Sequence, residues 1–191
     1  MKGKIIFLGI IFLFMNSIFA QKGSEQKFNQ QQKEKLKAYR QEQKNENQEF
    51  RKSLEGKTAE EKGKAIKSYK ENQYRENKAF REEMHQENLL FLKDKLAANT
   101  NLTEEQKNEL VNFFESQYQE NVSFRDKQHA KNIDFFGRIA NDPNLTQEEK
   151  KAALKGYLDE QKAEVNKHYQ QQKLENKAEK EKIGSTVKTA E

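Results

Sequence analysis

The sequence contains no cysteine and no tryptophan, and it has one proline and eight glycines in 191 residues. Without cysteine, a disulfide framework is excluded. So few prolines and glycines supply little for the tight turns of a compact sheet protein. Hydrophobic residues make up 33% of the chain and charged residues 35%, which leaves no material for a thick globular core. These absences favour an all-α protein of long, heavily charged helices.

Residues 1–20 differ from everything after them. Two lysines precede an apolar stretch from Ile5 to Met15, and the segment closes on the small residue Ala20. This order predicts a secretory signal peptide cleaved after about residue 20. An uncleaved anchor is the alternative, although the segment is short for a bilayer. We therefore expect a periplasmic or secreted protein without stable membrane insertion after cleavage, with a helical repeat domain over 21–182 and a flexible tail over 183–191.

The charge balance limits the choice of partner. Cleavage would remove Lys2 and Lys4 and lower the net charge from +5 to +3. Such a balanced chain has no excess of positive charge to attract a polyanion. We expect no nucleic-acid partner.

The chain repeats a polar motif. The pattern Gln-x-x-Glu-Asn-x-x-Phe-Arg begins at Gln43, Gln73 and Gln117. A weaker fourth copy begins at Gln161. The two central copies are 44 residues apart, and a period of this length indicates a repeated supersecondary unit.

Turn-like breaks separate the copies and divide the chain into four helices. We expect these at about 24–55, 59–97, 103–140 and 146–182. The predicted fold is all-α: four long antiparallel helices built from a repeat of about 44 residues, with coiled-coil-like packing. The sequence leaves open whether they form an extended bundle or curved helical hairpins.

The motif spacing also predicts how the helices pair. Asn77 and Asn121 have their midpoint in the second break, while Asn121 and Val165 have theirs at Pro143. The motif should therefore meet itself across both later hairpins. By the same argument the first helix, with Asn47, should be out of step by about 18 Å.

We interpret the motif as a polar layer that fixes which helices pair and in what register. A polar binding groove is the alternative. The layer residues are Gln73, Glu76, Asn77, Arg81, Gln117, Glu120, Asn121 and Arg125.

Groups that could carry catalysis are scarce. The chain has no cysteine nucleophile, no nucleophile elbow and no glycine-rich phosphate loop. We therefore expect neither an enzyme nor a bound cofactor. His85 and His129 each end a Glu-x-x-His or Asp-x-x-His step, but a hairpin turn between them would hold them about 20 Å apart along the axis. A weak metal site shared between chains remains the alternative.

Several apolar side chains stand in consecutive positions. Adjacent residues on a helix point in different directions, so they cannot all enter one core. We interpret them as a core or a homodimer interface, or alternatively as a surface that binds other proteins. They are Leu89, Leu90, Phe91, Leu92, Phe113, Phe114, Phe135 and Phe136.

Two helix starts share a motif. Thr103 and Gln106 form a capping-box pattern, and Thr146 and Glu149 form a second one. Each threonine is preceded by a leucine, Leu102 or Leu145. Leu102-Thr103-Glu104-Glu105-Gln106 resembles the Leu-Thr-x-x-Gln motif of the Spy/CpxP-like periplasmic proteins, and the second motif is a near copy.

This resemblance implies an ATP-independent envelope chaperone or stress-response protein that holds unfolded clients on a curved helical dimer. Some members of that family bind metal. We expect an exported, chaperone-like protein that binds unfolded or envelope proteins and forms a homodimer. The alternative is a structural or adhesive helical scaffold of the cell envelope.

Overall fold

The computed structural model describes residues 22–142 and 144–188. The predicted signal peptide lies outside these residues. Within them, no helix has an apolar stretch long enough to cross a bilayer.

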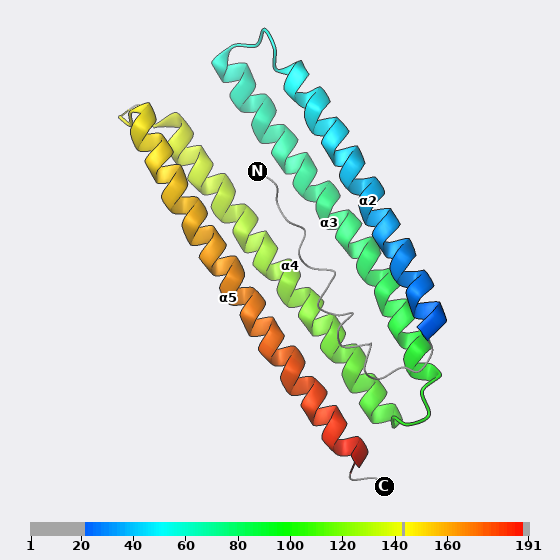
Figure 1. The fold of residues 1–191 in the computed structure, drawn as a ribbon. Helices are drawn as coiled ribbons and strands as arrows, with labels where there is room; N and C mark the ends of the chain where they lie inside the picture. The colour runs from blue at the N-terminus through cyan, green and yellow to red at the C-terminus, as the bar shows by residue number, and fades with distance from the viewer. Residues whose placement is uncertain (1–21, 143, 189–191) are drawn as a thin grey trace. The chain divides into compact units, whose positions relative to one another are not determined.

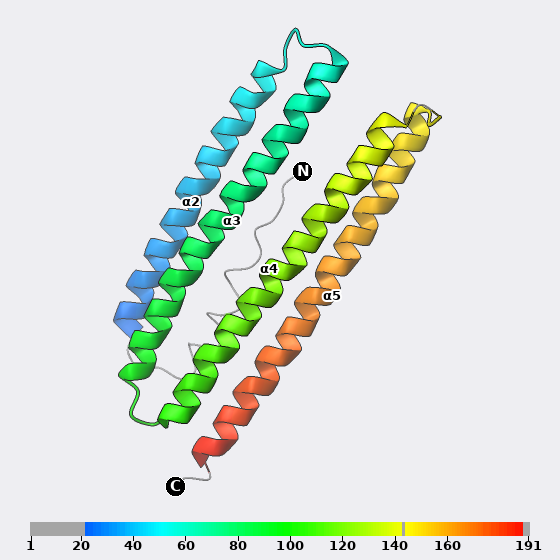
Figure 2. The ribbon, with the colours of Figure 1, turned by 180° about the vertical axis from the view of Figure 1, so that it is seen from behind.

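The described chain consists of four long α-helices, which confirms the all-α fold. They are α2 (Lys22–Ser53), α3 (Ala59–Ala97), α4 (Glu104–Asn141) and α5 (Gln147–Lys188). The chain divides into two compact units, and each is built on one antiparallel hairpin. The first contains α2 and α3 as far as Phe91, while the second contains the end of α3 from Leu92, together with α4 and α5. Both views of the ribbon show α2 alongside α3 and α4 alongside α5 (Figures 1 and 2).

The helix boundaries agree with the expected ones except at the C-terminal end. The expected tail over 183–191 is wrong for its first part, because α5 continues to Lys188 and Ile183 is buried at 4% exposure. The apolar Ile183 side chain packs as a core residue, which favours continuing the helix past the expected end.

The threonine caps form as expected. The Thr103 side chain accepts from the Gln106 backbone N–H, while the Gln106 side chain accepts from the Thr103 N–H. Thr146 and Glu149 make the same reciprocal pair. Both capping boxes are confirmed, and they satisfy backbone donors that a helix start leaves without partners.

Stacked aromatic rings join α2 to α3. Phe28 stacks on Phe91, with ring centroids 4.1 Å apart. Two further pairs follow at 3.9 and 3.8 Å, Tyr39 with Phe80 and Phe50 with Tyr69. Along each helix the rings are 11 residues apart, which is close to three full turns. The rings therefore stay on one line, which we call the ladder.

The second hairpin repeats the ladder between α4 and α5. Phe124 stacks on the imidazole of His168 at 4.1 Å, and Phe135 stacks on Tyr157 at 3.9 Å. The sequence midpoint of each pair is Thr146, whereas the predicted midpoint is Pro143. The register is therefore three residues later than predicted, yet the motif copies still meet, because Phe124 and His168 occupy the same position in their copies.

Polar pairs accompany the ladder at the same spacing. In the first hairpin Gln32 donates to Glu87 at 2.7 Å and Gln43 donates to Glu76 at 3.4 Å. Gln73 donates to Gln43 at 3.2 Å, so the motif copies of α2 and α3 are in contact. The predicted offset of about 18 Å is wrong. The chain turns directly after Gly56, whose positive φ of 74° suits glycine, and the rings then align the helices.

The two hairpins are copies of one another. Adding 85 to a ladder position of α2 gives the equivalent position of α4, and adding 88 does the same for α3 and α5. Tyr69 thus corresponds to Tyr157, Phe80 to His168 and Phe91 to Glu179. The structural repeat is therefore a pair of helices, twice the 44-residue period seen in the sequence.

Apolar burial in the second unit is concentrated near the α3–α4 turn. The buried apolar side chains there are Leu92, Leu96, Leu102, Leu110, Phe114, Tyr118 and Ile183. By contrast, none of the residues between 122 and 171 whose burial is described is fully buried. The ladder is therefore the main apolar contact between the two helices along this outer arm.

Candidate functional site

The ladder divides each hairpin into two faces. Each residue turns the helix by 100°. Side chains one or five positions after a ladder ring, or two or three positions before it, therefore point to the same side of the hairpin. We call this side the A face. Positions one, four or five before a ring, or three after it, lie on the opposite B face. Two antiparallel helices are exchanged by a two-fold axis perpendicular to the plane that contains them. Rotation about this axis keeps each face on its own side, so the same position rules apply to both helices.

Contacts between the helices agree with this division. Lys35 pairs with Glu83 at 2.6 Å and with Glu87 at 2.5 Å, and all three residues occupy B positions. Lys131 and Glu164, also in B positions, pair at 2.5 Å. These ion pairs bridge their hairpins along the B face.

The A face of the α4/α5 hairpin is rich in apolar side chains. Phe136 is 42% exposed and the others are half-buried. An arm of only two helices cannot enclose side chains that point away from their common seam. This surface, which we call the apolar face, consists of Val122, Ile133, Phe136, Leu158, Val165 and Tyr169.

The same face of the α2/α3 hairpin is basic. All of its basic side chains are exposed except that of Arg81, which is half-buried. This surface, which we call the basic face, consists of Lys33, Lys37, Arg40, Lys44, Arg51, Lys67, Lys70, Lys78 and Arg81. Equivalent scaffolds thus carry surfaces of different chemistry.

The expected apolar surface is not one continuous exposed patch. Of its eight members only Leu90, at 63%, and Phe136 are exposed. The rings of Phe91 and Phe135 belong to the ladder. The buried members are Leu89, Leu92 and Phe114. Because consecutive helical residues point in different directions, the eight residues divide between core, ladder and surface, and only Phe136 belongs to the apolar face.

The polar-layer residues divide between several roles. Gln73 contacts Gln43 across the first hairpin, while Gln117 donates to Glu175 at 2.6 Å across the second. Asn77 and Asn121 instead donate to backbone carbonyls one turn earlier in their own helices. The glutamines therefore bridge helices through their amide nitrogens, whereas the two asparagine nitrogens bond within their own helices and Asn121 reaches α5 through its Oδ1 atom.

The remaining layer residues lie at or near the surface. Glu76 accepts from Gln43, whereas Glu120 is exposed. Arg81 and Arg125 are half-buried. Burial raises the pKa of Tyr39 to about 12 and the positive charge of Arg81 opposes this shift, whereas Arg125 adds to the lowering of the His168 pKa that burial causes.

His168 replaces a phenylalanine of the first hairpin. Its Nε2 lies 3.0 Å from Asn121 Oδ1. Burial lowers the pKa of His168 and the positive charge of Arg125 lowers it further, while Glu175 opposes the shift. The neutral imidazole is therefore the form that fits the ladder.

The α4/α5 hairpin should lose stability in mild acid. A depressed pKa gives His168 a stabilising contribution that is present above its unfolded pKa of about 6.5 and is lost as the pH falls through the folded value. We expect the melting temperature to fall between about pH 7.5 and pH 5. His168→Phe should reduce that fall and His129→Phe should not. Equal pH dependence in wild type and His168→Phe would contradict the assignment.

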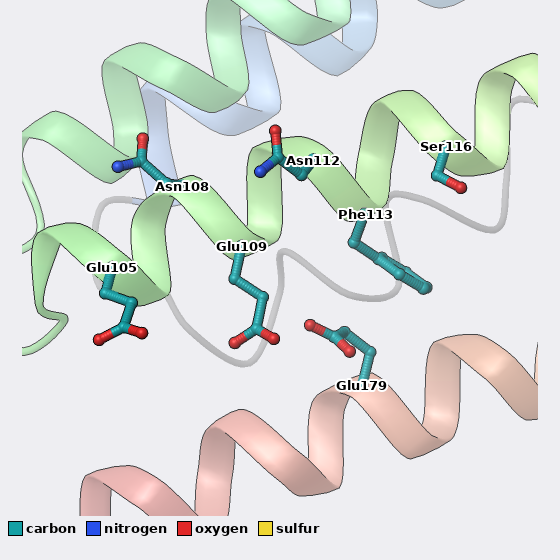
Figure 3. A pocket seen from close by; sticks show the side chains of 7 residues that line it. All are labelled: Glu105, Asn108, Glu109, Asn112, Phe113, Ser116 and Glu179. Atoms are coloured by element: carbon teal, nitrogen blue, oxygen red, sulfur yellow. The ribbon is translucent and has the colours of Figure 1, made fainter.

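At its third position in α4/α5, the ladder has a carboxylate in place of one of the two rings. Glu179 stands opposite Phe113, where the first hairpin pairs Phe91 with Phe28. Figure 3 shows Phe113 and Glu109 pointing from α4 toward Glu179 of α5. An open cleft of about 840 Å³ lies here. Its lining residues are Glu105, Asn108, Glu109, Asn112, Phe113, Ser116 and Glu179.

The Glu179 carboxylate lies in an unfavourable position. Its Oε1 atom is buried without a hydrogen-bond partner. Burial raises the pKa of Glu179 and the nearby Glu109 carboxylate raises it further, while Lys182 opposes the shift. Lys182 also forms an ion pair with Glu109. The site therefore opposes ionisation of Glu179.

The histidines considered as metal ligands lie in different surroundings. His85 is buried at 4% exposure and His129 is half-buried. No group of three or more His, Asp or Glu side chains with metal-binding geometry occurs within residues 22–142 and 144–188.

Comparison with known proteins does not assign the chain to a family. No family model matches the sequence, and no curated protein or solved structure is detectably similar to it. Functional inference therefore depends on the two faces described above.

Proposed function

We propose that this chain is an exported, ATP-independent, chaperone-like protein that binds unfolded or envelope proteins. The observation that carries the proposal is the apolar face of the α4/α5 hairpin. It combines aliphatic side chains with Phe136 and Tyr169 on a narrow arm. Such a surface suits partners that expose apolar segments and later bury them, since release then needs no nucleotide.

Two sequence features support the same proposal. The N-terminal segment has the layout of a signal peptide. The helix-start motifs at Leu102 and Leu145 resemble those of the Spy/CpxP-like proteins. We therefore propose a periplasmic or secreted, non-enzymatic protein that forms a homodimer and binds no nucleic acid.

A structural scaffold of the envelope is the second candidate. The observation in its favour is the duplicated hairpin, whose ladder recurs from Phe28 to Tyr157. Duplicated helical hairpins form long surfaces from repeated local contacts, which suits a spacer or an adhesive rod.

Suppression of aggregation tests the proposal. The mature protein, at equimolar ratio and without nucleotide, is expected to suppress aggregation of a thermally unfolding client. Phe136→Asp combined with Leu158→Asp should remove most of this effect, because buried carboxylates oppose apolar contact. Light scattering measures the result.

Leu174→Asp is the matched control. Leu174 is 63% exposed and lies on the B face, so this variant should keep the wild-type effect. Circular dichroism must show equal helicity in all variants. No suppression by the wild type would leave the scaffold as the better candidate, whereas equal loss in the control would remove the apolar face from the proposal.

A further inference from the structure

The B face of the α2/α3 hairpin is acidic, opposite to its basic face. Its acidic side chains are Glu34, Glu42, Glu46, Glu49, Glu76, Glu83 and Glu87, and they outnumber the basic side chains on the same face, which are Lys27, Lys35, Lys64 and Arg75. Among the B-face residues that contact across the hairpin, Lys35 supplies a positive charge to Glu83 and Glu87. One hairpin therefore carries opposite charges on its two broad sides.

The acidic side chains crowd one another. The pKa of Glu46 is raised by burial and further by the carboxylates of Glu76, Glu42 and Glu49. These groups come from both helices, so the crowding extends across the hairpin. An added positive surface would relieve it.

The two charged faces match in length and spacing. On the basic face, Lys33 and Lys44 are 11 residues apart, as are Lys70 and Arg81. On the acidic face, Glu76 and Glu87 have the same separation. Because 11 residues are close to three turns, neither row drifts around its helix over the length of the hairpin.

We propose that the basic face of one α2/α3 hairpin docks on the acidic face of the same hairpin in a second copy of this chain. The charge complementarity of the two faces selects this occupant, because one molecule supplies both surfaces. An anionic polymer or membrane would use the basic face alone and would leave the acidic face without a role.

This docking is head-to-tail, so it allows more than two copies to associate. The contact joins two different surfaces, so each added copy presents a fresh acidic or basic face. Exposed ion pairs are individually weak and are screened by salt. The assembly is therefore reversible, depends on concentration and uses a different hairpin from the one proposed to bind clients.

Charge reversal on either face tests the docking. The first variant carries Lys33→Glu, Lys44→Glu and Lys70→Glu, which lowers the summed charge of the nine basic-face positions from +9 to +3. The second carries Glu42→Lys, Glu49→Lys and Glu83→Lys, and has two basic faces. Lys35 keeps Glu87 as a partner in the second variant.

Sedimentation velocity at several protein concentrations supplies the readout. We expect the wild type to self-associate at about 20 mM salt and to weaken more than about tenfold by 500 mM. Each variant alone should lose most of this concentration-dependent association, and a one-to-one mixture should associate again. The control Lys127→Glu, Lys162→Glu and Lys167→Glu changes the net charge equally on the other hairpin, and it should associate like the wild type.

Several outcomes would overturn the docking. These are a wild type whose size does not grow with concentration at low salt, association that salt does not weaken, or a mixture of the two variants that does not associate. Binding of anionic vesicles by a wild type that shows no self-association would assign the basic face to a membrane instead. Circular dichroism of each variant confirms that the helices remain folded.

Discussion

Truncation of Phe80 to alanine is expected to lower the free energy of unfolding of the α2/α3 hairpin by about 2–4 kcal/mol. Phe80 stacks on Tyr39 with centroids 3.9 Å apart. None of the residues from 33 to 83 is fully buried, so this arm has no thick core to compensate for the lost ring. Chemical denaturation followed by circular dichroism measures the change.

Two variants control for the size of this effect. Phe80→Tyr keeps an aromatic ring in the ladder and should cost much less. Leu90→Ala removes an apolar side chain that is 63% exposed on the same helix, and it should change stability by less than about 0.5 kcal/mol. A loss for Phe80→Ala no larger than that for Leu90→Ala would show that the ladder does not hold the hairpin together.

Replacement of Glu179 by phenylalanine is expected to stabilise the α4/α5 hairpin by about 2 kcal/mol. The change would recreate at this position the pair that Phe91 makes with Phe28. It would also remove a carboxylate whose Oε1 is buried without a partner. The open cleft beside Phe113 supplies room for the new ring.

Further variants separate the two contributions. Glu179→Gln removes the charge without adding a ring, so it should give only part of the gain. Glu181→Phe adds a ring at a side chain that is 67% exposed and should give none. Denaturation at neutral pH measures all three. No gain for Glu179→Phe over Glu179→Gln would contradict the equivalence of positions 91 and 179.

Much of the fold could be predicted from the sequence. Helix periodicity and the threonine caps gave boundaries close to the observed ones, because caps such as Thr103 and Thr146 act within one turn of helix. The relative register of the helices was not predicted correctly. Alignment of the polar-motif copies predicts one register, whereas pairs of rings such as Phe124 and His168 hold the helices in another.

The signal that fixes the register was present in the sequence. Phe28, Tyr39 and Phe50 are 11 residues apart, and so are Phe113, Phe124 and Phe135. The 44-residue period contains four such steps, so the longer repeat concealed the shorter one. The apolar, basic and acidic faces follow from the ladder, because each face is defined by its position relative to the rings.

The candidate sites were harder to predict than the helices. The run from Leu89 to Leu92 suggested one apolar surface, yet its members are distributed around α3. The basic face was also missed, because the nearly balanced net charge conceals a separation of charge between the two sides of one hairpin. The net charge of a chain does not show how its positive and negative side chains are distributed between the two sides of a hairpin.

The 11-residue spacing makes the length of each arm adjustable in whole steps. Removing one such block from both helices of a hairpin would remove one step of the ladder. The remaining rings would still pair across the hairpin, and each face would stay on its own side. Removing four residues instead would rotate the outer part of the arm by about 40° against the inner part. Insertions and deletions compatible with this architecture should therefore come in matched pairs of 11 residues, each shortening or lengthening the arm by about 16.5 Å.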